Sequence, residues 1–191
     1  MTFKHHLLAG LLCLGIAPAA IGCGFHPSKE VQLESMYPGS LSVAVALRRA
    51  ADSGVIDDAA LEAQGKGTAF FALYRHSVLR LQEFRKALAA SPAAAELPSS
   101  FSLGYVETQL WSRYSQSDGK IHVDIHTDGP AEGEAVVLIG EPVLTELLAG
   151  RLSVDRALAD GMILIDGDKT ERTAIRHALI ATSMANKISS R

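Results

Sequence analysis

The chain has 191 residues, of which 48% are hydrophobic, and its formal net charge at pH 7 is −3. This length suits one domain with a core of its own, and the composition excludes an intrinsically disordered chain. The slightly acidic balance excludes a protein that binds nucleic acid through its phosphates, so we expect no nucleic-acid partner.

Residues 1–22 have the pattern of a signal peptide. A positive start with Lys4 is followed by an uncharged apolar run that ends at Gly22. The alternative is a transmembrane anchor, but Pro18 interrupts the run and no basic cluster follows it. We therefore expect export rather than a membrane span.

Cys23 follows this segment in the sequence AIGC at 20–23, which resembles the bacterial lipobox. Cys13 would be removed with the signal peptide, which leaves Cys23 without an internal disulfide partner. Because an unpaired thiol is a liability in an oxidising compartment, acylation with palmitate would explain its presence. The alternative is an ordinary cleavage near 17–19 that leaves Cys23 free. We expect a lipoprotein on the periplasmic face of a bacterial membrane, with the outer membrane favoured because no Asp follows Cys23.

The remaining chain is expected to form a tether at 23–40 and one domain at 41–191. The first part of this domain, 41–95, has the composition and periodicity of helices. We expect a helix at 41–53 after a cap at Ser40, a helical turn within 55–67, and the strongest helix at 68–90.

From residue 101 the hydrophobic period changes from helical to alternating. The sequence predicts a long strand at 101–114, a second strand at 120–126 and a third at 135–140, joined by polar turns. Three consecutive strands with short turns favour an antiparallel meander.

The C-terminal part contains two glycines that end short helices. We expect helices at 141–150 and 153–161, a strand at 162–167, and a last helix opened by Asp168 with a capping box. The predicted fold class is therefore α+β, with a single mainly antiparallel sheet and helices packed on one face.

The C-terminal signature resembles that of the sterol carrier protein domain family. It consists of a helix with a glycine turn, a short helix, an apolar strand and a Gly-Asp pair, carried by Leu147, Leu148, Gly150, Leu152, Ala157, Gly161, Gly167 and Asp168. With the preceding strands, the resemblance extends from about Leu103 to Leu179. It implies an α+β domain, at 101–191, that binds lipids, sterols or acyl chains in an apolar tunnel between sheet and helices. The export signal and the helical part at 41–95 depart from the family pattern.

Such a tunnel would be lined by apolar and aromatic residues of the strands and of the helices after them. The candidates are Leu103, Tyr105, Trp111, Val136, Leu138, Leu148, Leu152 and Ile163. Ordinary core packing predicts the same residues, so the sequence leaves open whether the interior is hollow or filled.

The residues His122, Asp124 and His126 form the best chemical constellation. Strict alternation would place them on one face of a strand, where imidazole and carboxylate could bind zinc. The alternative is the polar face of an amphipathic strand. No nucleophile motif is present, His76 and His177 lie outside any motif, and we expect neither a catalytic residue nor a cofactor.

These observations predict an envelope lipoprotein that binds a lipid or another hydrophobic small molecule without catalysis. One alternative is a non-catalytic scaffold module with an envelope protein as its partner. Another is a metal-dependent enzyme that uses His122, Asp124 and His126.

Overall fold

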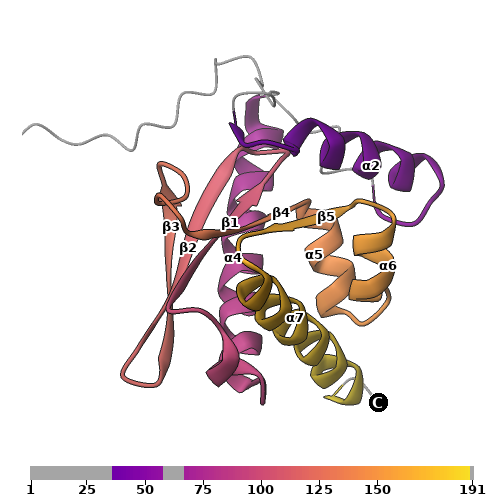
Figure 1. The fold of residues 1–191 in the computed structure, drawn as a ribbon. Coiled ribbons are helices and arrows are strands. Elements are labelled where there is room, and N and C mark those ends of the chain that lie inside the picture. Colours follow the sequence, from indigo (N-terminus) through magenta and orange to yellow (C-terminus); the bar gives the residue numbers. More distant parts are fainter. Residues whose placement is uncertain (1–35, 58–66, 190–191) are drawn as a thin grey trace, which may run out of the picture.

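The computed structural model describes residues 36–57 and 67–189 (Figure 1). The predicted signal peptide, Cys23, most of the predicted tether and most of the predicted helical turn lie outside the described residues. The elements in chain order are α2 (Ser40–Asp52), α4 (Gly67–Ala90), the 3-10 helix η1 (Ala94–Glu96), β1 (Ser100–Tyr105), β2 (Leu110–Ser117), β3 (Lys120–Thr127), β4 (Ala135–Ile139), α5 (Glu141–Leu148), α6 (Val154–Ala159), β5 (Ile163–Asp166) and α7 (Lys169–Ser189).

The strands form one five-stranded sheet in the order β3-β2-β1-β4-β5. Three neighbouring pairs are antiparallel, whereas β1 and β4 are parallel. The predicted fold class, α+β with a single mainly antiparallel sheet, is confirmed. The order of helices and strands from β4 to α7 is also the one that the C-terminal signature implies.

The prediction of one long strand at 101–114 was wrong, because the chain reverses between β1 and β2. Val106, Glu107 and Thr108 in this turn are buried, and Gln109 has φ 52°. The turn has no glycine or proline, and burial of its apolar and β-branched residues makes it look like strand in the sequence. The antiparallel meander therefore consists of β1, β2 and β3, and β4, predicted as its third strand, pairs with β1 in parallel instead.

The helices α4, α5 and α7 pack against one another on one side of the sheet. This helix-covered face carries Phe101 and Leu103, and the Phe101 ring stacks on Tyr114 of β2 with centroids 5.0 Å apart. Phe84 of α4 meets the same Tyr114 ring edge-on at 5.4 Å. Alternation along the strands places Trp111 on the other face, called here the opposite face.

The opposite face is covered in part by residues that precede α2. A Cβ on Gly104 would lie 2.8 Å from both the Met36 Cε and the Trp111 ring, so glycine at this position leaves room for both side chains. Tyr37 contacts Trp111 edge-on. Residues 36–37, which lie within the predicted tether, therefore pack against the opposite face of the sheet.

α2 lies across the end of the sheet where β4 ends and β5 begins (Figure 1). Its buried side carries Val43, Leu47 and Ala50. Leu47 lies so close to Gly140 that a Cβ there would be 2.7 Å from its Cδ2. These contacts make the N-terminal helix part of the same hydrophobic core as the sheet.

The predicted glycine turns and the predicted capping box at the helix ends are confirmed. Gly150 and Gly161 have φ of 67° and 74°, the left-handed conformation that favours glycine after a helix. Asp168 and Glu171 form the predicted capping box, with backbone-to-carboxylate distances of 2.8 and 3.0 Å. Among the described residues, no helix is long and apolar enough to cross a membrane.

Candidate functional site

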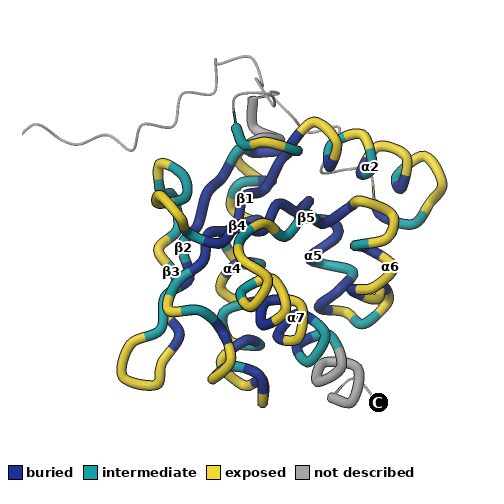
Figure 2. Tube along the Cα trace, in the orientation of Figure 1, coloured by how far each residue is buried: buried dark blue, intermediate teal, exposed yellow. Residues whose placement is uncertain are grey.

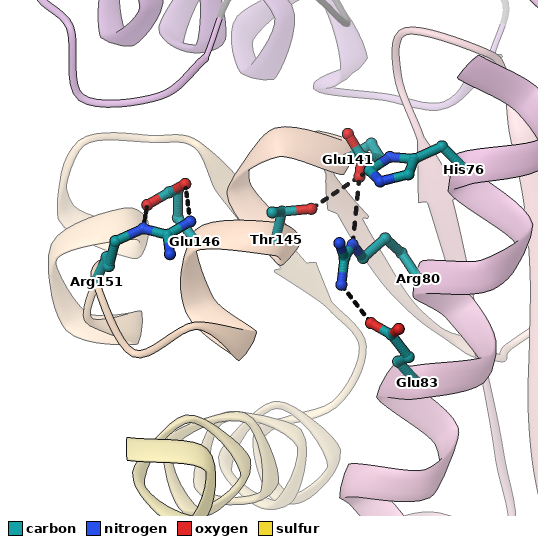
Figure 3. A network of polar contacts seen from close by, with 7 residues as sticks. All are labelled: His76, Arg80, Glu83, Glu141, Thr145, Glu146 and Arg151. Atoms are coloured by element: carbon teal, nitrogen blue, oxygen red, sulfur yellow. Dashed lines mark hydrogen bonds and ion pairs between the residues drawn. The ribbon is translucent and has the colours of Figure 1, made fainter. Parts of the chain in front are cut away.

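A group of polar side chains surrounds Glu141, the first residue of α5 (Figure 3). Its carboxylate is only 5% exposed and accepts a 2.8 Å hydrogen bond from Thr145, one turn along the same helix. From α4, Nδ1 of His76 lies 3.0 Å and Nε of Arg80 lies 3.9 Å from the same oxygen, Oε1. Arg80 also pairs with Glu83. Because His76 is about half exposed, at 49%, this group connects the interior to the solvent.

Glu107 lies deeper, in the turn between β1 and β2, and is 2% exposed. Its Oε1 would be 2.5 Å from a Cβ on Gly140, so the carboxyl group sits directly beneath the start of α5. Burial raises the pKa of Glu107 to about 8 and the nearby Glu141 carboxylate adds to this, while the backbone N–H groups of Glu107 and Glu141 act in the opposite direction. Glu107 is therefore predominantly protonated at neutral pH and can donate a hydrogen bond.

Four buried side-chain hydroxyl groups have no hydrogen-bond partner among the described residues: Ser77 Oγ, Tyr105 OH, Thr108 Oγ1 and Ser112 Oγ. Together with the Glu107 carboxyl group we call this set the inner polar cluster. A buried polar group without a partner costs about 1–3 kcal/mol, so a native protein seldom leaves several together.

The sheet register places Tyr105 and Ser112 on the helix-covered face. Ser112 pairs with Leu103 across β1 and β2, which places it on the same face as Tyr105. Burial raises the pKa of Tyr105 well above its ordinary value, and the charges of Tyr114, Glu141 and Glu107 add to this effect.

Ser77 reaches this face from α4. The Tyr74 hydroxyl lies 3.5 Å from His126, and the Leu81 carbonyl accepts a 3.1 Å hydrogen bond from Tyr114. Ser77 lies about one helical turn from each of these contacts. It therefore points toward the sheet between them, in agreement with its complete burial.

The structure divides the predicted tunnel lining between two faces. All eight residues are buried, with exposures of 0% to 7%, and belong to one contiguous core. Strand register places Leu103, Tyr105 and Ile163 on the helix-covered face, and places Trp111, Val136 and Leu138 on the opposite face. The remaining two, Leu148 and Leu152, lie at and beyond the end of α5. These eight residues are thus distributed over both faces of the sheet and the end of α5.

The structure does not bring His122, Asp124 and His126 together. His122 and Asp124 are exposed, on the strand face of their pairing partners Ser115 and Arg113. The β2–β3 register shifts between Trp111 and Ser112, and His126, opposite this irregularity, has φ 80°. This bulge ends the alternation that the sequence suggested, and His126 turns to α4, where it meets the Tyr74 ring with centroids 5.7 Å apart. Within 36–57 and 67–189 no group of three His, Cys, Asp or Glu side chains could hold a metal ion.

Two open cavities, of about 410 and 420 Å³, lie side by side on the surface and share Pro130. The carboxylate of Glu134, which lines the first of them, is already engaged. Glu134 accepts hydrogen bonds from Ser102 at 2.8 Å and from Arg113 at 3.1 Å. Burial alone would raise the pKa of Glu134, but these bonds and the backbone N–H of Ala131 hold it below its ordinary value. This arrangement fastens the loop before β4 to the sheet.

Sequence reasoning missed Glu107 and Glu141 and treated His76 as a residue outside any site. The available signal was an acidic residue within an otherwise aromatic and apolar stretch, FSLGYVETQLW at 101–111. A charged residue inside a predicted buried strand indicates either a hidden turn or a functional group, and Glu107 is in a hidden turn. His177, the other isolated histidine, is exposed and lies 3.4 Å from Glu96.

Comparisons with known proteins give distant likenesses only. No family model matches the chain, and no curated protein matches it. A solved structure described as "UbiJ-SCP2 Ubiquinone synthesis protein" aligns with a TM-score of 0.43 and 16% identity, over 61% of this chain and 98% of that one. The inverting sec-alkylsulfatase Pisa1 from Pseudomonas sp. aligns with a TM-score of 0.39 and 16% identity, over 82% of this chain and 32% of that one.

A double mutant of the sec-alkyl sulfatase PisA1 aligns with a TM-score of 0.37 and 14% identity, over 47% of this chain. The present chain spans only 14% of that enzyme's length. Since these TM-scores are below 0.5, none of the likenesses assigns a family, a ligand or an activity. The fold class stands on the sheet and helices described above.

Proposed function

We propose that the protein is an exported lipoprotein, acylated at Cys23, whose domain binds an amphipathic, lipid-like molecule without bond chemistry. The observation that carries the ligand-binding part of the proposal is the inner polar cluster, which adds four buried hydroxyl groups without partners and the buried Glu107 carboxyl group to an otherwise apolar core. Ligand sites of this kind are mostly apolar, with a few polar groups that fix the orientation.

The inner polar cluster suits an uncharged polar head group. Glu107 is protonated at neutral pH, and the other members are hydroxyl groups, each of which can donate or accept a hydrogen bond. A hydroxyl or carbonyl head group would satisfy them. The apolar part of the ligand would lie against neighbours such as Leu81 and Leu103, where burial contributes about 25 cal/mol per Å².

Native mass spectrometry of the full chain tests ligand binding. We expect a co-purifying apolar molecule, or uptake of a long-chain alcohol after delipidation, and weaker uptake in Tyr105→Phe and Ser112→Ala. Each lost hydrogen bond should cost about 0.5–1.5 kcal/mol, or roughly a two- to tenfold change in affinity. Ser115→Ala, on the other face of β2, is the matched control. A folded protein that takes up no such molecule would overturn this part of the proposal.

Incorporation of labelled palmitate tests the anchor. We expect label in the full chain produced in a Gram-negative host and none in Cys23→Ser. Release of unlabelled mature protein from the wild-type chain would replace the lipoprotein with a free exported protein.

A scaffold module for an envelope complex is the second candidate. It is favoured by the tight packing of the predicted lining residues, none of which is more than 7% exposed. This alternative predicts a folded protein without lipid uptake and a defined complex by cross-linking in intact cells. Recovery of a ligand that Tyr105→Phe binds more weakly would decide against it.

A further inference from the structure

The outward side of α2 is exposed (Figure 2), and it carries apolar residues near its start and arginines toward its end. Leu41 and Val45, one turn apart, are 47% and 43% exposed. Arg48 and Arg49 follow them, and neither forms an ion pair within the described part of the chain. Asp52, in the last turn, leaves the helix with a net charge of +1 from two arginines and one aspartate. Leu41, Val45 and Arg48 recur at spacings of four and three residues, which places them on one side of the helix.

The short separation in sequence between Cys23 and α2 suggests that a membrane covers the outward side of α2. Met36, which packs on the sheet just before α2, follows Cys23 by 13 residues (36 − 23). Even a fully extended segment of this length spans at most about 45 Å, and a flexible one has a root-mean-square span of about 20 Å. An acyl chain on Cys23 would therefore keep α2 near the bilayer surface. In Figure 1, α2 lies at the end of the molecule away from the C-terminal end of α7.

Charge complementarity also favours the bilayer surface as the partner of α2. The chain as a whole has a formal net charge of −3, so its overall charge does not attract it to anionic lipids. The two arginines give α2 the opposite sign beside an exposed apolar pair. Interfacial helices combine these features, with apolar residues at the head-group boundary and Lys or Arg near the phosphates.

We infer that α2 docks on an anionic membrane surface, with Leu41 and Val45 at the head-group boundary and Arg48 and Arg49 on lipid phosphates. The inference rests on the proposed acylation of Cys23, which supplies the proximity. It assigns the domain a fixed orientation on the membrane, with α7 directed away from the bilayer.

An environment-sensitive fluorophore on an introduced thiol tests the docking. Acylation occupies the Cys23 thiol, so Val45→Cys and the control Thr173→Cys, on α7, each present a single reactive thiol. The acylated full chain is reconstituted in vesicles of phosphatidylethanolamine and phosphatidylglycerol, about three to one, to give an anionic surface. We expect blue-shifted emission at position 45 and aqueous emission at position 173. Aqueous emission at both positions would overturn the docking.

Charge reversal tests the role of the arginines. Each basic residue near an anionic surface contributes about a fivefold preference, so Arg48→Glu with Arg49→Glu should reduce the ratio of docked to undocked protein at least about 25-fold. Arg75→Glu with Lys86→Glu, two exposed positions on α4, changes the net charge equally and should leave the emission unchanged. An unchanged blue shift in the first double variant would contradict the inference.

Palmitate incorporation is measured on the same preparations. Labelled protein with position 45 in water would overturn the docking while the proposed lipoprotein stands. Absence of label would overturn the acylation and, with it, the docking that depends on it.

Discussion

The hydroxyl group of Tyr37 donates a 2.9 Å hydrogen bond to Oδ2 of Asp166, the last residue of β5. The Tyr37 ring also meets Trp111 of β2 edge-on, with centroids 6.1 Å apart. Burial, followed by the hydrogen bond to Asp166 and its negative charge, raises the pKa of Tyr37 to about 12. The chain just before α2 is thus connected to the edge strand and to the meander.

Removal of this connection should destabilise the whole domain. We expect Tyr37→Phe to lower the free energy of unfolding by about 0.5–1.5 kcal/mol, the usual worth of one hydrogen bond. Tyr37→Ala should cost more, because it also removes the contact with Trp111. Urea denaturation measures both, and an unchanged midpoint for Tyr37→Ala would show that residues 36–37 contribute nothing to the fold.

Gly104→Ala should destabilise the protein although glycine in a strand is usually unfavourable. The new Cβ would lie 2.8 Å from both Met36 Cε and the Trp111 ring. Overpacking of a core typically costs about 1–3 kcal/mol. Met36→Ala should reduce the penalty of Gly104→Ala, because it frees one of the two contacts. If Gly104→Ala destabilises the wild type and the Met36→Ala variant equally, the new Cβ clashes with Trp111 alone.

The pair of Arg113 and Glu134 should contribute more than an exposed pair. The Glu134 side chain is 3% exposed, and its loss would leave Ser102 and the half-buried Arg113 without their acceptor. We expect Glu134→Ala to cost about 2 kcal/mol. The control is Arg151, which is 62% exposed and pairs with Glu146 at 2.7 Å; Arg151→Ala should cost less than about 1 kcal/mol.

Acid should weaken the Arg113–Glu134 pair. The pKa of Glu134 is lowered in the folded protein, so its contribution is present above the pKa of the unfolded chain and is lost as the pH falls through the folded value. Urea denaturation on the acid side measures this loss. Equal acid sensitivity of wild type and Glu134→Ala would contradict the assignment.

Glu107 should produce the opposite pH dependence. Its pKa rises from 4.5 to about 8 on folding, so the folded protein keeps a proton that the unfolded chain releases. The stability that this group contributes is complete below the unfolded pKa and is lost as the pH rises toward about 8, with a slope of at most about 1.4 kcal/mol per pH unit.

Glu107→Gln removes this titration and should flatten the stability profile between about pH 5 and 8. Glu132→Gln, at an exposed position in the loop before β4, is the control and should keep the wild-type slope. Urea denaturation across this range measures both variants. A wild-type profile without the slope, or an unchanged slope in Glu107→Gln, would show that Glu107 is ionised in the folded protein.

Signals within a few residues of each other determined the local structure. The 3.6-residue period predicted the helix observed as Gly67–Ala90, and the Asp168 capping box predicted the start of α7. Gly150 and Gly161 correctly marked two helix ends. A cap, a glycine turn or an amphipathic helix depends mainly on neighbouring residues, so the sequence alone predicts it.

Only the tertiary structure decided which strands pair and which buried groups meet. The turn at Glu107 is formed by packing rather than by local propensity, and it contains no glycine or proline. Because the chain reverses there, the meander is complete with β3, and β4 pairs with β1 in parallel. The bulge that directs His126 to Tyr74 and the burial of Glu107 beneath α5 likewise depend on contacts between distant segments. The sequence by itself therefore determined the helices, most of the strands and the fold class. Strand pairing and the inner polar cluster arise from long-range burial, which no local pattern of residues encodes.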